Sequence, residues 1–247
     1  MLAKVWPLAL LCCGAFGQEH KPLTVAAAAN LTDVFAEIAT KFQTQTGIAV
    51  VYSFGATANL AMQAEHAAPF DVFAAADVAH VEQLDKEGLL VAGSKAVYAR
   101  GRLVLWMPPA SRAHVSRVED LKDDDVKIVA IANPKLAPYG AAAVESLHKL
   151  GLWSAVEPKV VYAETISAAK QFAATGNADA AFTAYSLVLH SGGNTIEIPG
   201  NLHAPIDQAV AILRSSDQQG AARQFVQFLL GAPGREMLER YGYELPR

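Results

Sequence analysis

Short apolar runs alternate with helix-like spacing along the first part of the chain. Leu23–Ala29 is an apolar run with the length of a buried strand. From Leu31 to Phe42, apolar residues then recur at the three- and four-residue intervals of one helix face, and Gly47 ends the pattern. The alternation continues with expected strands at Ile48–Phe54 and Asp71–Ala76 and expected helices at Ala58–His66 and Val78–Glu87. Strands and helices in this order, with short connections, indicate a parallel sheet covered by helices.

Two long extended runs, Tyr98–Met107 and Pro205–Arg214, interrupt this alternation. Between them we expect a second series, with strands at Lys127–Ala132, Val160–Ala163 and Ala178–Ala184 and helices at Ala141–Leu150 and Ile166–Thr175; helices at Gln219–Leu230 and Gly234–Tyr241 follow the second run. The class is therefore α/β. One domain inserted into another through two extended crossings accounts for the layout, and so does one continuous doubly wound domain. The pattern alone leaves both open.

Composition and charge restrict the kinds of molecule that this chain could bind. Of the 247 residues, 52% are hydrophobic and 18% charged, so the chain has ample apolar material for a core. Lys and Arg number 20 against 24 Asp and Glu, and this acidic balance argues against a nucleic-acid partner, which would require a basic face. A small anionic ligand remains open, because backbone amides bind anions without any net positive charge.

The first seventeen residues have the pattern of a cleaved secretory signal. Lys4 precedes an apolar stretch, and Ala15 and Gly17 stand two apart before Gln18, so residues 1–17 are the predicted signal peptide. A buried helix or a membrane anchor is the alternative, but the stretch is shorter than the about 20 apolar residues that cross a bilayer. Leu11 before Cys12 does not suit a lipoprotein signal, although a lipid anchor stays open. Both cysteines lie in this segment, so we expect a soluble, exported product without disulfides.

Catalytic and metal-binding motifs are missing from the sequence. It contains no Gly-x-Ser-x-Gly elbow, no P-loop and no Gly-x-Gly-x-x-Gly after a strand, and no two histidines have the spacing of a helix-borne metal site. The acidic run Asp123–Asp125 lies in a polar stretch, and a solvated turn is its expected role. We therefore expect a protein that is not an enzyme.

Four strand-to-helix junctions carry the remaining candidate chemistry. They read Ala28-Ala29-Asn30-Leu31-Thr32-Asp33, Phe54-Gly55-Ala56-Thr57-Ala58-Asn59, Asn133-Pro134 followed by Pro138-Tyr139-Gly140-Ala141, and Ala163-Glu164-Thr165-Ile166-Ser167, with Asn30 expected to cap its helix. None of these residues is Lys or Arg. In parallel α/β sheets such junctions meet at one edge, and each helix start carries free N–H groups and about half a unit of positive charge. Together they would suit a desolvated dianion, although ordinary helix capping explains each junction taken singly.

The sequences of these junctions resemble those of the periplasmic molybdate-binding proteins of ABC transporters, which are type II periplasmic binding proteins. The likeness runs from about Leu23 to Pro246 and rests on Ala27-Ala28-Ala29-Asn30-Leu31-Thr32, Phe54-Gly55-Ala56-Thr57, Asp71-Val72-Phe73-Ala74-Ala75-Ala76-Asp77, Pro138-Tyr139-Gly140 and Tyr241-Gly242-Tyr243-Glu244-Leu245-Pro246. It implies a two-lobed type II fold, with each lobe a mostly parallel sheet flanked by helices. Lobe I would comprise residues 18–101 and 206–247, and lobe II residues 102–205.

The resemblance also implies a function. The protein would bind molybdate, and tungstate as well, in the periplasm as a monomer without a cofactor or a direct metal-ion ligand. It would then deliver the oxyanion to a membrane permease driven by a cytoplasmic ATPase. The family's oxyanion contacts fall here on Ala29, Asn30, Thr57, Tyr139 and Ile166.

The chain departs from the commonest family pattern at two positions. Many relatives have serine at Asn30, and many have a ligand tyrosine where this chain has Ala184. Relatives with the Pro-Tyr-Gly form take their aromatic contact from the position of Tyr139. We therefore expect Tyr185, one residue further along a predicted strand, to pack in the core. Two acidic residues, Asp71 and Asp77, are expected to support the hinge or cap a helix rather than contact a dianion.

Other functions stay open at this point. The same fold could bind sulfate, an organic anion or ferric iron, but an organic acid usually calls for an arginine clamp and iron for several tyrosines or carboxylates together. An exported α/β hydrolase or transferase would need an activated nucleophile with a base in reach, and the sequence offers no such set.

Overall fold

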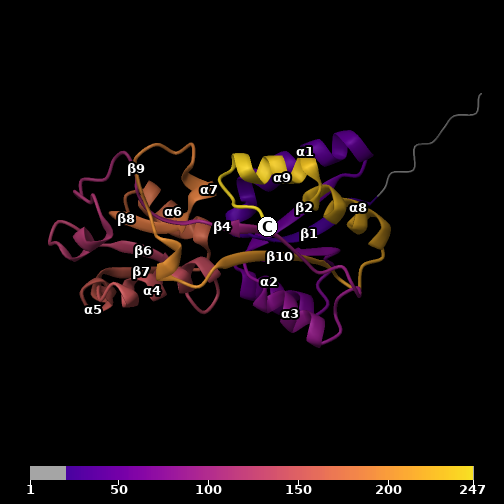
Figure 1. Ribbon diagram of the computed structural model, residues 1–247, viewed down its shortest axis with the longest axis horizontal. Coiled ribbons are helices and arrows are strands. Elements are labelled where there is room, and N and C mark those ends of the chain that lie inside the picture. The colour runs from indigo at the N-terminus through magenta and orange to yellow at the C-terminus, as the bar shows by residue number, and fades with distance from the viewer. Residues whose placement is uncertain (1–20, 247) are drawn as a thin grey trace, which may run out of the picture.

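The computed structural model describes residues 21–246, whose strands form two separate five-stranded sheets. The predicted signal peptide, residues 1–17, lies outside the described residues. Figure 1 shows the two sheets side by side, each with its own helices. Lobe I is built on the sheet with the order β2-β1-β3-β10-β4, and lobe II on the sheet with the order β7-β6-β8-β5-β9.

The elements of each lobe are as follows. Lobe I contains β1 (Leu23–Ala28), α1 (Thr32–Thr46), β2 (Val50–Gly55), α2 (Thr57–Glu65), β3 (Val72–Ala74), α3 (Ala79–Lys86), β4 (Ala96–Gly101), β10 (Ile206–Ile212), α8 (Gln219–Leu230) and α9 (Ala232–Arg240). Lobe II contains β5 (Leu103–Met107), β6 (Val129–Ala132), α4 (Pro138–Lys149), α5 (Trp153–Val156), β7 (Val160–Ala163), α6 (Ile166–Ala174), β8 (Ala180–Ala184), α7 (Tyr185–Val188) and β9 (Asn194–Glu197). Short 3₁₀ turns lie at Ala29–Leu31, Val118–Lys122, Glu157–Lys159 and Gly200–Leu202.

Both sheets are mixed in strand direction, and they follow the same plan. In lobe I, β1 is parallel to β2 and β3, whereas β10 runs antiparallel to β3 and β4. In lobe II, β6 is parallel to β7 and β8, whereas β5 runs antiparallel to β8 and β9. The predicted two-lobed α/β fold is confirmed, with antiparallel pairing added by the strands at the crossing between the lobes.

Helix α1 shows how the apolar pattern determines the packing. Its buried residues Val34, Phe35, Ile38 and Phe42 are the predicted face, and Gly47 ends the helix in a left-handed conformation with φ 73°. This face packs against α8, in which Phe225 meets the Phe42 ring edge-on at 5.5 Å between centroids. Helices α2 and α3 cover the other face of the same sheet (Figure 1), so the sheet is buried on both sides.

The structure differs from the sequence prediction at several places. Helix α4 begins at Pro138 rather than Ala141, because proline has no N–H to leave unpaired in a first turn. The extended run Tyr98–Met107 is two strands in different lobes, β4 and β5. Strand β9 (Asn194–Glu197) was not predicted, since its mostly exposed polar residues lack an apolar pattern. Within residues 21–246, no helix has the length and apolar character that crossing a membrane requires.

An irregularity in the sheet lies where the chain passes between the lobes. The pairing of β10 with β4 shifts register between Gln208 and Ala209, whose partners are Ala99 and Val97. Tyr98 is therefore the extra residue of a bulge, and both Tyr98 and Ala99 are buried. A bulge redirects side chains of the strand that carries it. Here it turns Tyr98 toward the same side as Gln208, within 2.9 Å of its Oε1 atom.

Candidate functional site

A small cavity lies between the two lobes, where the helices of both begin. Its volume is about 10 Å³, far below the about 300–1,000 Å³ typical of sites for drug-sized ligands, so it has room only for a small ligand. Its lining residues are Ala28, Ala29, Asn30, Gly55, Ala56, Thr57, Ala76, Ala137, Pro138, Tyr139 and Ile166. The structure thus brings all five predicted site residues to one place, from four junctions far apart in the sequence.

Helix starts supply most of this lining. Thr57 and Ile166 are the first residues of α2 and α6, and Tyr139 is the second residue of α4. Backbone N–H groups at these positions have no partner within their own helix. No lining residue carries a charge. Lys135 does belong to the third junction, but it is exposed and does not line the cavity.

Asn30 does not cap a helix, contrary to the prediction. It lies in the 3₁₀ turn Ala29–Leu31, and no side chain caps the start of that turn or of α1. Its side chain is 1% exposed, and its Nδ2 donates to Gln208 Oε1 at 2.9 Å and to the Tyr243 hydroxyl at 3.0 Å. The Tyr243 hydroxyl also donates to the Asn30 carbonyl oxygen at 2.8 Å. Asn30 is held by tertiary contacts that its local sequence does not reveal.

Thr57 brings a buried hydroxyl group to the cavity. The residue is 1% exposed, and its Oγ1 accepts a hydrogen bond from the Ala76 amide at 3.2 Å. This contact leaves the hydroxyl hydrogen to be donated elsewhere. Thr165, by contrast, makes an ordinary cap, since its Oγ1 accepts from the Ala168 amide at 3.1 Å. Ile166 therefore lines the cavity at the start of a helix that is already capped.

Tyr139 contributes to the cavity differently from the other residues. Its hydroxyl accepts from Gln208 Nε2 at 3.0 Å, and a Cβ atom built on Gly101 would overlap that hydroxyl oxygen. The hydroxyl thus lies beside the strands of the crossing. Burial raises the pKa of Tyr139 well above its ordinary value, so the group stays protonated at neutral pH.

Several contacts join the lobes around the cavity. Asn59 Nδ2 of α2 donates to Glu164 Oε1 of lobe II at 2.8 Å, and the Ala58 amide donates to the Leu136 carbonyl at 3.1 Å. On the opposite side, Ser186 Oγ of α7 donates to the Asn30 carbonyl at 3.1 Å. These hydrogen bonds join the two lobes directly.

Three residues that the sequence analysis set apart from the ligand contacts lie outside the cavity lining. Tyr185 begins α7 rather than continuing a strand, and its ring packs under the Arg102 guanidinium at 4.5 Å. Asp71 accepts from the Thr24 amide at 2.8 Å and from Ser216 Oγ at 2.6 Å. Asp77 accepts from the His80 amide at 3.0 Å at the start of α3, which is a capping role. Its carboxylate also hydrogen-bonds the His80 ring, which raises the pKa of that histidine.

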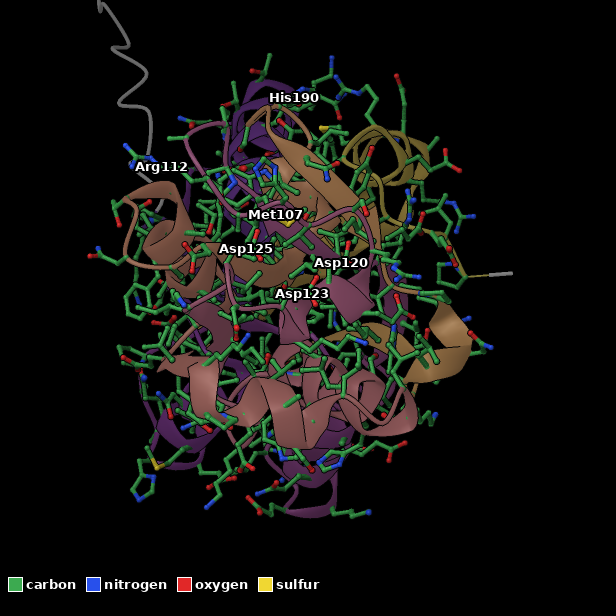
Figure 2. All side chains as sticks on the ribbon, turned by 90° about the vertical axis from the view of Figure 1, so that its left-hand side faces the viewer. Met107, Arg112, Asp120, Asp123, Asp125 and His190 are labelled. Atoms are coloured by element: carbon green, nitrogen blue, oxygen red, sulfur yellow. The ribbon has the colours of Figure 1, made fainter. Side chains whose placement is uncertain are left out.

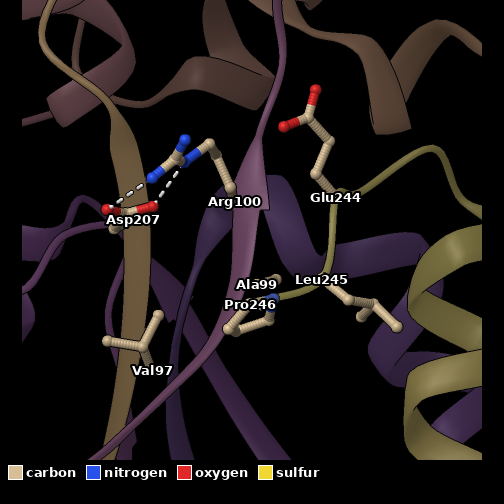
Figure 3. A pocket seen from close by; sticks show the side chains of 7 residues that line it. All are labelled: Val97, Ala99, Arg100, Asp207, Glu244, Leu245 and Pro246. Atoms are coloured by element: carbon tan, nitrogen blue, oxygen red, sulfur yellow. Dashed lines mark hydrogen bonds and ion pairs between the residues drawn. The ribbon is translucent and has the colours of Figure 1, made fainter.

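A larger hollow of about 560 Å³ lies on the outer side of the crossing strands. Figure 3 shows Arg100 bonded to Asp207 of the neighbouring strand, with Glu244 on the other side of Arg100. The two Arg100–Asp207 hydrogen bonds measure 2.6 and 3.0 Å. Because Asp207 already neutralises Arg100 and Glu244 adds a negative charge, this hollow does not suit an anion.

The acidic run of lobe II holds its own loop together. Figure 2 looks onto the end of the molecule that carries Asp120, Asp123 and Asp125. Asp120 accepts from the Ser116 amide and hydroxyl, and these hydrogen bonds lower its pKa. Asp125 accepts from the His114 amide at 3.0 Å. Over residues 21–246, no three His, Cys, Asp or Glu side chains are grouped as a metal site would need.

Four polar residues near the site were missed by the sequence analysis. They are Tyr98, Ser186, Gln208 and Tyr243, and all are buried. Tyr98, Ser186 and Gln208 lie in segments that read as ordinary strands or helices without a motif. Tyr243 lies in the C-terminal motif 241–246, which was quoted for the resemblance but not assigned to the site. Their proximity to Asn30 depends on how the lobes meet, so the linear pattern carried no signal for them.

Comparisons with known proteins match nearly the whole chain. The family described as bacterial extracellular solute-binding protein matches residues 23–244. The molybdate-binding protein ModA of Azotobacter vinelandii is 43% identical over 244 residues, which are 96% of this chain and 94% of that protein. The solved structure of the Azotobacter vinelandii periplasmic molybdate-binding protein has a TM-score of 0.84 and 32% identity, and the match covers 91% of this chain and 100% of that one. A substrate binding domain of a putative molybdenum ABC transporter from Clostridium difficile has a TM-score of 0.69 and 28% identity, over 92% of this chain and 99% of that one.

Proposed function

The chain belongs to the bacterial extracellular solute-binding proteins, and we propose that it binds molybdate as a member of their molybdate-binding group. The observation that carries the proposal is the composition of the cavity between the lobes. Helix starts from both lobes line it, and no charged residue does. A dianion at this position is balanced by backbone dipoles and neutral hydrogen-bond donors, without a buried counterion.

The proposed contacts are those of the five predicted site residues. Ala29 and Asn30 supply donors from the turn before α1, and Thr57 supplies its hydroxyl and amide. From lobe II come the backbone amides of Tyr139 and Ile166. Because both lobes contribute, an anion completes its set of donors only when the lobes close on it. This requirement couples binding to closure.

The same arrangement explains the expected choice of anion. Tungstate is close to molybdate in size and charge and should bind as well. Sulfate is smaller and cannot reach all the fixed donors at once, so it should be rejected. Fixed amides favour one oxyanion radius over another.

We further propose a role in import. The protein is exported, captures the oxyanion in the periplasm and presents it as a monomer to a membrane permease driven by a cytoplasmic ATPase. It acts as a binding protein rather than as an enzyme, and it needs no cofactor. The likeness to a substrate binding domain of a putative molybdenum ABC transporter supports this role.

Thermal unfolding with added anions tests the binding function. A ligand that binds only the folded chain stabilises it by RT ln(1 + [L]/Kd), which is about 2.7 kcal/mol at a hundred times Kd. Molybdate and tungstate should each raise the melting temperature, and sulfate at the same concentration should leave it unchanged. A rise with sulfate but not with molybdate would overturn the assignment.

A further inference from the structure

Gln208 connects the site residues of the two lobes without lining the cavity. Its side chain is fully buried in β10. Its Oε1 accepts from Asn30 Nδ2 at 2.9 Å and lies 2.9 Å from the Tyr98 hydroxyl, and its Nε2 donates to the Tyr139 hydroxyl at 3.0 Å. Gln208 thus contacts Asn30 of lobe I and Tyr139 of lobe II at once, and the bulge brings the Tyr98 hydroxyl to it.

One atom of this network has no partner. Asn30 Oδ1 is buried and accepts no hydrogen bond from any residue that the structure describes. It lies on the edge of the amide opposite Nδ2, which is engaged by Gln208 and Tyr243. Asn30 lines the cavity, whereas Gln208 and Tyr243 do not. A dianion in the cavity needs a donor from Asn30, and a carbonyl oxygen cannot donate.

Exchanging oxygen and nitrogen in both side-chain amides resolves this mismatch without moving any other heavy atom. The Tyr243 hydroxyl then donates to Asn30 Oδ1, and the Asn30 carbonyl keeps Ser186 Oγ as its donor. Gln208 Nε2 then donates to Asn30 Oδ1, and Gln208 Oε1 accepts from the Tyr139 hydroxyl. The Tyr98 hydroxyl accepts from Gln208 and keeps the Ala75 carbonyl, 3.1 Å away, as its acceptor. The Asn30 NH₂ group takes the position of the unpartnered oxygen, so every polar group of the network finds a partner once an anion is present.

We propose that Gln208 is a positioning residue of the anion site and that the Asn30 and Gln208 amides together adopt this exchanged orientation when an anion is bound. With an anion bound, Gln208 donates to Asn30, which presents its NH₂ group to the anion. Tyr139 donates to Gln208 in this state, so the same side chain links the donor in lobe I to helix α4 in lobe II. The inference rests on the proposed function, because it assumes an anion in the cavity.

Two variants test this role by affinity. Gln208→Met keeps the length of the side chain but removes both hydrogen-bonding ends, and it should weaken molybdate binding at least about tenfold in calorimetric titration. Tyr98→Phe is the matched control, since it removes a buried hydroxyl of the same network that contacts neither Asn30 nor Tyr139. It should change the affinity by less than about threefold, even if both variants melt at a lower temperature. Equal affinity losses in the two variants would overturn the positioning role.

The amide orientations have a direct readout that does not depend on how a variant folds. Neutron diffraction from deuterated crystals of the unchanged chain grown with molybdate distinguishes nitrogen from oxygen. We expect ND₂ of Asn30 to face the anion and ND₂ of Gln208 to face Asn30. Oδ1 of Asn30 facing a bound anion would overturn the inference and leave the proposed function intact. Failure of the unchanged chain to bind molybdate in the thermal experiment would overturn the proposed function itself.

Discussion

The strands at the lobe crossing, β4 and β10, carry opposite chemistry on their two sides. On the inner side, Tyr98 and Gln208 are buried and take part in uncharged hydrogen bonds. On the outer side, Arg100 of β4 pairs with Asp207 of β10 next to Glu244 (Figure 3), and all three are at least partly exposed. Adjacent residues of a strand point to opposite faces, so a step of one residue along β10 separates the two chemistries.

The two sides differ in how well they suit a dianion. The outer hollow is larger, but its arginine is already matched by a carboxylate and a second carboxylate stands nearby. The inner cavity is smaller and has only neutral donors, which suit an anion that arrives without its hydration shell. The volume of a hollow and the formal positive charge of its lining are therefore poor guides to an anion site. The number of unpaired hydrogen-bond donors in the lining is a better guide.

Gly101→Ala should give the largest effect, because it acts on the inner side where the lobes meet. An added Cβ would overlap the Tyr139 hydroxyl oxygen and lie 2.7 Å from Gln208 Nε2. Overpacking costs about 1–3 kcal/mol, and if it falls on the closed state the affinity for molybdate should drop by up to about a hundredfold. Calorimetric titration measures the change.

A second glycine provides the control for this variant. Gly220 lies in α8, and no atom stands within 4 Å of a Cβ added there. Gly220→Ala should leave molybdate affinity unchanged and raise stability by about 0.5–1 kcal/mol, since alanine is the better helix former. Full affinity in Gly101→Ala would contradict the close packing of Tyr139 at the crossing.

Substitution of the donors themselves should have the next largest effect. Thr57→Ala and Asn30→Ala each remove a hydrogen bond to a charged ligand, which is worth about 1.5–3 kcal/mol, so each should weaken molybdate binding at least about tenfold. Thr40→Ala is the control, because that hydroxyl only bonds the Ala36 carbonyl on the exposed side of α1. Unchanged affinity in both donor variants would remove the proposed site.

Tyr139→Phe should cost less than either donor variant. Its hydroxyl is bonded to Gln208, and the proposed contact with the anion is the backbone amide, which the substitution keeps. Loss of a neutral hydrogen bond is worth about 0.5–1.5 kcal/mol, so titration should show at most about a tenfold weaker affinity. A loss exceeding that of Thr57→Ala would place the hydroxyl itself on the anion.

The residues that line the site were more predictable from the sequence than the tertiary contacts that hold them in place. Thr57 and Ile166 lie in the first turn of their helices, and the local sequence pattern predicts where a helix begins. Their convergence follows from the strand order, because parallel strands end at a common edge. Asn30 was assigned to the site from the same kind of junction, but its expected capping role is not what the structure shows.

Features that depend on contacts between distant segments could not be predicted from the pattern. Gln208 and Asn30 are 178 residues apart, and only the assembled crossing brings them together. The bulge at Tyr98 likewise arises from pairing between β4 and β10, whose sequences read as plain extended runs. Strand β9 was not predicted, because an exposed edge strand needs no alternation of apolar and polar residues.

Arg100→Gln tests the outer side and should have little effect on binding. The substitution breaks an exposed ion pair with Asp207, and such pairs contribute about 0–1 kcal/mol to stability. Both partners lie on strands of lobe I, so no contact between the lobes is lost. Molybdate affinity should stay within about twofold of the unchanged chain, and a larger loss would mean that the outer pair controls closure.

The smallest expected effect is that of pH on affinity between pH 6 and 9. No cavity-lining residue titrates in that range, because burial raises the pKa of Tyr139 and the other lining side chains are apolar or neutral. His80, whose pKa is raised by its hydrogen bond to Asp77, lies outside the lining. Affinities measured at several pH values should agree within about twofold. A steep fall in affinity above the pH range in which histidine titrates would show that a cationic side chain binds the anion.

Stability should respond to pH where affinity does not. Burial raises the pKa values of Tyr98, Tyr139 and Tyr243 in the folded chain, whereas unfolded tyrosines ionise near about pH 10. Above that pH the unfolded chain binds fewer protons than the folded one, so the free energy of unfolding must fall as pH rises. The stabilisation is complete below pH 10 and declines above it. Denaturant unfolding at several pH values should show this decline, to which Tyr52 and Tyr241 also contribute because their pKa values are raised as well. Tyr98→Phe should make the decline shallower by removing one of these groups.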